Sequence, residues 1–218
     1  MLMSRAVPVA FHDTWAGVLM ALALALRQPG RYGASMVAAL AAVLFRELAL
    51  ALIVLMAVCA AYERQWREMV GWGAVLLVAV VGIGLHAAAL LPLRHPADLS
   101  SQGWGGLGGW SYAVAAVRET SGIGLLPLAA EFVVVPLSLF GWLSWKSPVA
   151  LRVSGMLLGY LLALMIFARP ENFYWALMIA PLLLGGLGLA PAALFALVKR
   201  CRPLARGIAK RPSMGAAT

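Results

Sequence analysis

Seven apolar segments, separated by charges, prolines and glycines, constrain this chain more than any other feature. They are Thr14–Leu26, Gly33–Phe45, Leu48–Tyr62, Val70–Leu91, Gly122–Trp145, Val149–Ala168 and Phe173–Val198. The last four are long enough to cross a bilayer core, which takes about 20 helical residues. Only 11% of the residues are charged and 63% are hydrophobic, so a soluble chain could not cover its surface with polar groups. The sequence therefore predicts an all-α, polytopic transmembrane helix bundle with about seven apolar segments, three of them short.

The second and third segments admit two topologies. Gly33–Tyr62 could form one helix with Arg46 and Glu47 near its middle. That helix would be about 45 Å long at 1.5 Å per residue, beyond a hydrocarbon core of about 30 Å, and would place two charges at lipid depth. The alternative is a hairpin of two short helices that turns at Arg46 and Glu47 and leaves both charges in water. We favour the hairpin because it buries neither charge in hydrocarbon.

The chain is basic, with 17 Lys and Arg against 8 Asp and Glu. Bases of a membrane protein gather in cytoplasmic loops, so this excess indicates orientation rather than nucleic-acid binding. The hairpin topology places most of them inside, namely Arg27, Arg31, Arg64, Arg67, Lys146, Arg152, Lys199, Arg200, Arg202, Arg206, Lys210 and Arg211. We therefore predict a multi-pass protein of the inner (plasma) membrane, with its N-terminus outside and its C-terminus in the cytoplasm. Residues 1–198 would form the transmembrane domain and residues 199–218 a basic cytoplasmic tail that contacts membrane lipids.

The same topology gathers polar residues at the outer face. These are His12, Asp13, Arg46, Glu47, Arg94, His95, Asp98, Arg118, Glu119, Arg169, Glu171 and Asn172. Arginines hold phosphate by charge-assisted hydrogen bonds, and a carboxylate can remove a proton from an attacking hydroxyl. A cleft of both above a bilayer suits an anionic lipid phosphate. Structural alternatives stay open, because Asp13 could cap a helix, and Arg46 and Glu47 could be solvated turn residues or partners in a structural ion pair.

Two outer loops carry glycine and aromatic residues. Pro92–Thr120 is the one long hydrophilic connection, and it contains the glycine-rich stretch from Gln102 to Trp110. Within it, Leu107–Arg118 predicts a short interfacial helix. In the second loop, Arg169-Pro-Glu-Asn-Phe-Tyr-Trp175, the proline suits a helix entry and the aromatic residues suit headgroup depth.

Glu131 is the one carboxylate amid a long apolar segment, Gly122–Trp145. An ionisable group at that depth is costly, so it is neutral, paired or functional. His86, within Val70–Leu91, is a candidate partner. In a small transporter, these two intramembrane ionisable residues would form a proton path.

One stretch of the chain begins with His12-Asp-Thr-Trp-Ala-Gly17, continues through a short apolar helix to Arg27 and Arg31, and ends with Ala-Ala-Val-Leu-Phe-Arg-Glu47. This stretch resembles the middle of the polyprenyl-phosphate-sugar-dependent glycosyltransferases of the GT-C fold. Arg169–Trp175 looks like the last outer loop of a bacterial branch of that family. The resemblance covers most of the chain, through loose patterns of apolar residues and single charges. It implies a polyprenyl-phosphate-linked sugar as donor and inverting transfer at the outer face. By matching position, it implies an acidic site residue at Asp13, a lipid-phosphate pocket lined by Arg46 and Glu47, and closure of that pocket by Arg169, Glu171 and Asn172. We therefore take Asp13 and Glu47 as candidate catalytic residues. The candidate substrate-binding residues are His12, Arg46, Arg169, Glu171, Asn172 and Tyr174.

One departure from the family bears on activity. The family's main catalytic acid lies in a first outer loop after an N-terminal helix, and no part of this sequence matches that loop. We therefore expect the C-terminal portion of a glycosyltransferase-like protein, and whether this chain is itself an enzyme stays open. The alternatives are a non-catalytic membrane subunit, partnered by other subunits, or the small transporter. Walker, dinucleotide, HExxH and GxSxG motifs are missing, so we expect no cofactor, with a divalent metal left open.

Overall fold

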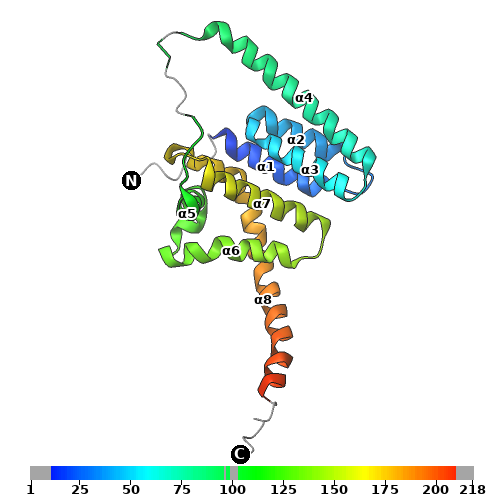
Figure 1. Ribbon diagram of the computed structural model, residues 1–218, viewed down its shortest axis with the longest axis vertical. Helices are drawn as coiled ribbons and strands as arrows, with labels where there is room; N and C mark the ends of the chain where they lie inside the picture. The colour runs from blue at the N-terminus through cyan, green and yellow to red at the C-terminus, as the bar shows by residue number, and fades with distance from the viewer. Residues whose placement is uncertain (1–10, 96, 99–102, 210–218) are drawn as a thin grey trace, which may run out of the picture.

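The computed structural model describes residues 11–95, 97–98 and 103–209, and these fold into helices and connecting turns without a β-strand (Figure 1). Arg5, Gln102, Lys210 and Arg211 lie outside the described residues, as do the side chains of Arg202 and Arg206. The α-helices are α1 (His12–Leu26), α2 (Gly33–Phe45), α3 (Leu50–Tyr62), α4 (Trp66–Leu90), α5 (Gly109–Thr120), α6 (Leu128–Ser144), α7 (Pro148–Ile166) and α8 (Ala180–Ala209). Short 3-10 helices are η2 (Glu47–Ala49), η3 (Leu91–Leu93), η4 (Gly122–Leu125) and η5 (Pro170–Met178).

The hairpin prediction is confirmed in the backbone. α2 ends at Phe45, and Arg46 takes an extended conformation before η2 and α3 begin. The Ser35 hydroxyl near the start of α2 donates to the Ala23 carbonyl near the end of α1, so these two helices are antiparallel. One end of the bundle therefore holds Asp13 and Arg46, and the opposite end holds the chain that leaves α1. We refer to them as the Arg46 end and the Arg27 end.

The structure corrects two predicted segments. Gly122–Trp145 is not one helix, because the chain is extended at Leu126 and Pro127 and α6 begins only at Leu128. The ring of Pro127 disfavours helical backbone at the preceding residue, which explains the break. Phe173–Val198 is also divided, between η5 and α8, at Ile179.

Three helices are long and apolar enough to cross a membrane by length and composition, namely Trp66–Leu93, Pro148–Ile166 and Ala180–Cys201. Four shorter apolar helices accompany them, namely His12–Leu26, Gly33–Phe45, Glu47–Tyr62 and Ala129–Ser144. α4 is almost wholly exposed, and its buried residues, Glu68, Trp72 and Ala79, all lie in its first fourteen positions. An outward surface of valine and leucine on this scale suits lipid as its solvent, as expected of a membrane protein.

Glycines allow α6 and α8 to approach backbone to backbone. A Cβ built on Gly141 would collide with the carbonyl oxygen of Gly186, and one on Gly186 would collide with the carbonyl oxygen of Ser138. Two side chains hold the same interface, since the Ser138 hydroxyl and the Trp142 indole donate to the carbonyls of Leu183 and Leu182. Apolar surfaces gain little by meeting in lipid, so close contacts between small residues and hydrogen bonds are what join such helices.

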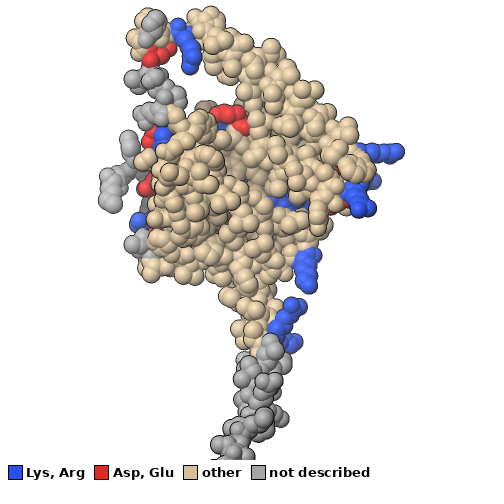
Figure 2. Space-filling model, in the orientation of Figure 1, with Lys and Arg blue, Asp and Glu red and all other residues tan. Residues whose placement is uncertain are grey.

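A buried ion network joins four helices at the Arg27 end. Arg27, after α1, contacts Glu68 of α4 at 2.8 Å and Glu63, after α3, at 3.0 Å. Arg152 of α7 contacts the same Glu63 at 2.8 Å and is 1% exposed. Trp72 donates its indole N–H to Glu68. Arg27 and Arg152 are therefore paired inside the fold rather than being solvated loop bases, whereas Figure 2 shows other basic side chains exposed around the α3–α4 turn.

Glu131 has a different partner from the one the sequence suggested. Its carboxylate, in the first turn of α6, lies 3.0 Å from the guanidinium of Arg118 on α5 and is 1% exposed. His86 is exposed on α4 and makes no contact with Glu131 in the structure. Glu131 therefore joins α5 to α6, and the predicted pairing with His86 is wrong.

Candidate functional site

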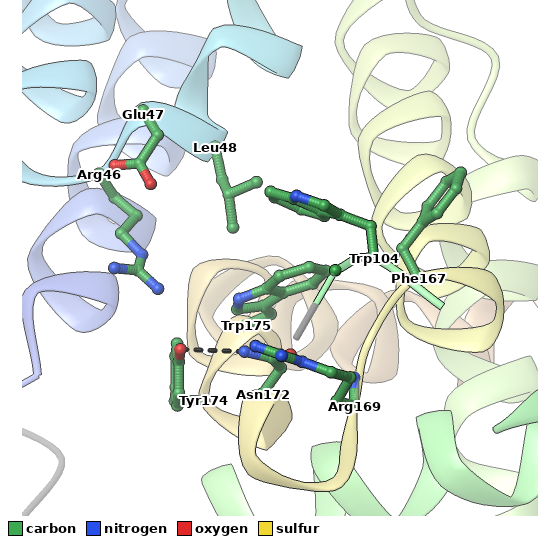
Figure 3. A pocket seen from close by; sticks show the side chains of 10 residues that line it. Arg46, Glu47, Leu48, Trp104, Phe167, Arg169, Asn172, Tyr174 and Trp175 are labelled. Carbon is green, nitrogen blue, oxygen red and sulfur yellow. Dashed lines mark hydrogen bonds between the residues drawn. The ribbon is translucent and has the colours of Figure 1, made fainter. Parts of the chain in front are cut away.

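A cavity of about 160 Å³ opens at the Arg46 end of the bundle (Figure 3). Three segments line it, namely the α2–α3 turn, the glycine-rich segment before α5, and the stretch from the end of α7 into η5. The lining residues are Arg46, Glu47, Leu48, Gly103, Trp104, Phe167, Arg169, Asn172, Tyr174 and Trp175. Pockets that bury a whole drug-sized ligand measure about 300–1,000 Å³, so this cavity accommodates one group of a larger ligand.

Arg46 is held by a buried carboxylate. Its Nε lies 2.9 Å from Oδ1 of Asp13, whose side chain is 4% exposed in the first turn of α1. Its guanidinium carbon also lies 5.1 Å from the centre of the Tyr174 ring. Burial disfavours the charged form of Arg46, but Asp13, Tyr174 and Glu47 outweigh it, and the net effect raises the pKa of this guanidinium. Arg46 is therefore a fixed, permanent positive charge beside the cavity.

The turn that carries Arg46 and Glu47 is fixed from behind by α7. The buried hydroxyl of Tyr160 donates to the carbonyl oxygen of Leu48 at 3.0 Å. Gly17 of α1 meets the backbone of η5 closely, since a Cβ there would lie 2.7 Å from the Leu177 carbonyl oxygen. These contacts bring the α2–α3 turn, α1 and η5 together around one cavity.

The η5 segment presents its polar residues through a capped first turn. Pro170 begins the helix, as its sequence context predicted, and the Asn172 side chain accepts a hydrogen bond from the Arg169 backbone N–H at 3.1 Å. The amide nitrogen of Asn172 donates to the Tyr174 hydroxyl at 3.1 Å, and this bond appears as the dashed line in Figure 3. Arg169 pairs with Glu171 at 3.3 Å. Asn172 therefore fixes the positions of both Arg169 and Tyr174.

The glycine-rich segment lines the cavity with Gly103 and Trp104, and its position is fixed by the packing of α5 against η5. The predicted interfacial helix Leu107–Arg118 is present as α5, shifted by two residues, and its Tyr112 hydroxyl donates to the Arg169 carbonyl at 2.5 Å. Burial raises the pKa of Tyr112 to about 12, so this hydroxyl remains a donor at neutral pH. Gly106 packs directly on the Ala168 carbonyl, where a side chain would not fit. Trp104 is thereby placed with its ring centre 5.7 Å from that of Trp175.

The structure brings together only part of the predicted site. Arg46, Glu47, Arg169, Asn172 and Tyr174 line the cavity, and Asp13 supports it through Arg46. The remaining predicted site residues are not among its lining, and these are the exposed His12, Glu171 and His86 and the buried Glu131.

Five lining residues were not expected from the sequence, namely Leu48, Gly103, Trp104, Phe167 and Trp175. The sequence context of Trp104 and Trp175 predicted side chains at headgroup depth, but a tryptophan at that depth can either anchor the protein in lipid or line a cavity. Leu48 and Phe167 carried no such signal, since each is one apolar residue within a predicted apolar segment, Leu48–Tyr62 or Val149–Ala168.

Within the described residues, no three His, Cys, Asp or Glu side chains lie close enough together to hold a metal ion. Comparison of the chain with protein-family models, with curated proteins and with solved structures finds no match.

Proposed function

We propose that this chain is a glycosyltransferase-like membrane protein that transfers a sugar from a polyprenyl-phosphate donor at the outer face of the bacterial plasma membrane. The observation that carries the proposal is that Arg46, Arg169 and Glu47 line one cavity at the end of a bundle of apolar helices. Two guanidiniums suit the phosphate of the donor, and one carboxylate suits proton transfer. Because the helices below the cavity are apolar and lie in the bilayer, the lipid chain of such a donor can remain in the hydrocarbon beside them.

In the proposed reaction, Glu47 accepts the proton of an acceptor hydroxyl while the hydroxyl oxygen attacks the anomeric carbon of the sugar. The bond between that carbon and the phosphate oxygen breaks with inversion, and the electron pair leaves on polyprenyl phosphate. Arg46 and Arg169 stabilise the negative charge that develops on this leaving group. The proton on Glu47 is then released to water.

Asp13 has a positioning role in this proposal. Its carboxylate is buried and bound to the Nε of Arg46, and it is not among the residues that line the cavity. We assign proton transfer to Glu47, which lines the cavity and is exposed at its rim. Asn172 and Tyr174 hold the η5 side of the phosphate site.

Membrane orientation is a separate part of the proposal, and cysteine labelling tests it. We expect a cysteine in place of Glu47 to react with a membrane-impermeant maleimide in intact cells, because the Arg46 end faces outward. A cysteine in place of Arg64, at the Arg27 end, should react only after the cells are permeabilised. The native Cys59 is buried and Cys201 is exposed, so both are replaced by serine beforehand. Labelling of the Arg64 position alone in intact cells would reverse the orientation.

The transfer itself is tested with the full chain reconstituted in liposomes. Synthetic polyprenyl-phosphate-linked hexoses are supplied with an alcohol acceptor, and release of polyprenyl phosphate is followed by chromatography. We expect release that depends on both the acceptor and the protein. Absence of release with every donor would contradict the enzymatic proposal and favour a non-catalytic membrane subunit.

A further inference from the structure

The indole nitrogen of Trp175 is a hydrogen-bond donor that the fold buries without a partner. Trp175 is 5% exposed, and its Nε1 forms no hydrogen bond within the described structure. The buried Trp72 indole donates to Glu68, and the half-buried Trp142 indole donates to the Leu182 carbonyl. Because an unsatisfied buried donor is destabilising, the exception at Trp175 requires an explanation.

This donor belongs to the wall of the cavity. Trp175 lines it, and Figure 3 shows the nitrogen edge of the indole turned toward the side where Arg46 and Tyr174 lie. Trp104 packs against the indole at 5.7 Å between ring centres with an interplanar angle of 40°. The indole is therefore held in place in the cavity wall, with its N–H on the side where Arg46 and Tyr174 lie.

The surrounding charges define what kind of acceptor this N–H can meet. Arg46 and Arg169 line the same cavity, so the polar side favours an anion. The opposite side carries the apolar Leu48, Trp104 and Phe167 (Figure 3). A phosphate ester of a lipid has both features, a small anionic group and an apolar chain attached to it.

We propose that Trp175 donates its indole N–H to a phosphate oxygen of the lipid-phosphate ligand and thereby determines the specificity of the site. This inference deepens the proposed function and rests on it for the class of ligand. Guanidinium groups attract any anion, whereas a single fixed N–H selects an oxygen at one place in the cavity. Trp175 is a binding residue with no part in proton transfer.

The test compares wild-type protein with Trp175→Phe, using isothermal titration calorimetry of the full chain in detergent micelles with farnesyl phosphate. Phenylalanine keeps an aromatic ring beside Trp104 and removes the N–H. A hydrogen bond to a charged group is worth about 1.5–3 kcal/mol, so we expect Kd to rise roughly 10- to 100-fold. Trp145→Phe is the control, because Trp145 lies at the end of α6 outside the cavity and should leave Kd unchanged.

Two further probes separate the sources of phosphate. Farnesol, which has no phosphate, should bind wild type and Trp175→Phe equally. Inorganic phosphate should bind wild type more weakly than farnesyl phosphate does, and equal affinity would overturn the assignment to a lipid phosphate.

The outcomes distinguish this inference from the function on which it rests. Equal Kd of wild type and Trp175→Phe for farnesyl phosphate would overturn the role of Trp175 and leave the proposed function standing. Failure of the wild type to bind farnesyl phosphate would overturn both. If Trp175→Phe does not fold, benzothienylalanine at position 175 replaces it, since this tryptophan isostere carries sulfur in place of the N–H. The same rise in Kd is then expected.

Discussion

Glu47→Gln is expected to lower the rate of sugar transfer by about 10²–10⁴-fold, the contribution that a general base makes. Glutamine has the size of glutamate but cannot accept the proton of the acceptor hydroxyl. Glu47 forms none of the ion pairs in the described part of the chain, so its replacement should leave the fold intact. The measurement is the initial rate of polyprenyl phosphate release in liposomes, with farnesyl phosphate affinity measured in parallel.

The matched control is Glu119→Gln. Glu119 is an exposed carboxylate near the end of α5, outside the cavity lining, and its replacement should leave the rate unchanged. If Glu47→Gln transferred sugar within about twofold of the wild-type rate, Glu47 would not be the base, because general-base catalysis would then contribute less than its usual range. A parallel loss of affinity for farnesyl phosphate would instead indicate that Glu47 acts in binding.

Glu63→Gln is expected to lower the free energy of unfolding by about 3–5 kcal/mol, because it leaves a buried charge without its partner. Arg152 is 1% exposed and would keep its hydrogen bond to the Pro148 carbonyl and an uncharged amide oxygen at position 63, but no counter-charge. Arg27 would retain Glu68. The measurement is unfolding by sodium dodecyl sulfate in mixed micelles, followed by circular dichroism.

A double-mutant cycle identifies the cause of that loss. In Glu63→Gln/Arg152→Met the stranded cation is also removed, so the double variant should be more stable than Glu63→Gln alone. Glu171→Gln is the exposed counterpart, because the Glu171 side chain is 54% exposed in its pair with Arg169. Such an exposed ion pair should contribute less than about 1 kcal/mol to the free energy of unfolding. A double variant less stable than Glu63→Gln alone would show that Arg152 stabilises the fold through its packing rather than through the ion network.

The sequence predicted those features of the fold that depend on local chemistry. Charge at Arg46 and Glu47 predicted the hairpin, because one helix through both residues would bury them in hydrocarbon. Pro127 was visible in Gly122–Trp145, yet a proline can either kink a membrane helix or end it, and the sequence does not distinguish the two. In the structure the helical backbone is interrupted at Leu126 and Pro127, and α6 begins after them. Arg27 and Arg152, two of the predicted cytoplasmic bases, are buried because they pair with Glu63 and Glu68 in the ion network.

Long-range pairing is what the sequence could not provide. The hydrogen bonds from Arg27 to Glu68 and from Arg152 to Glu63 join residues 41 and 89 positions apart, so no local pattern reveals them. The same holds for the cavity, where Trp104 reaches Trp175 only because Gly106 packs on the Ala168 carbonyl. Residue types therefore indicated a phosphate site at one end, and tertiary packing decided which of them share it.

The uneven burial of α4 has a mechanical consequence. Glu68, Trp72 and Ala79 anchor the first half of this helix, and the residues from Val80 to Leu90 are exposed apart from the half-buried Ile83. We expect the second half to change its tilt at little cost to the core, because Ile83 is its one side chain packed against the hydrophobic cluster. Spanning helices adjust to thicker or thinner bilayers by tilting, at a cost of fractions of a kcal/mol per Å of mismatch. We expect such a tilt of α4 to leave the cavity at the Arg46 end as it is, because no residue of α4 lines that cavity.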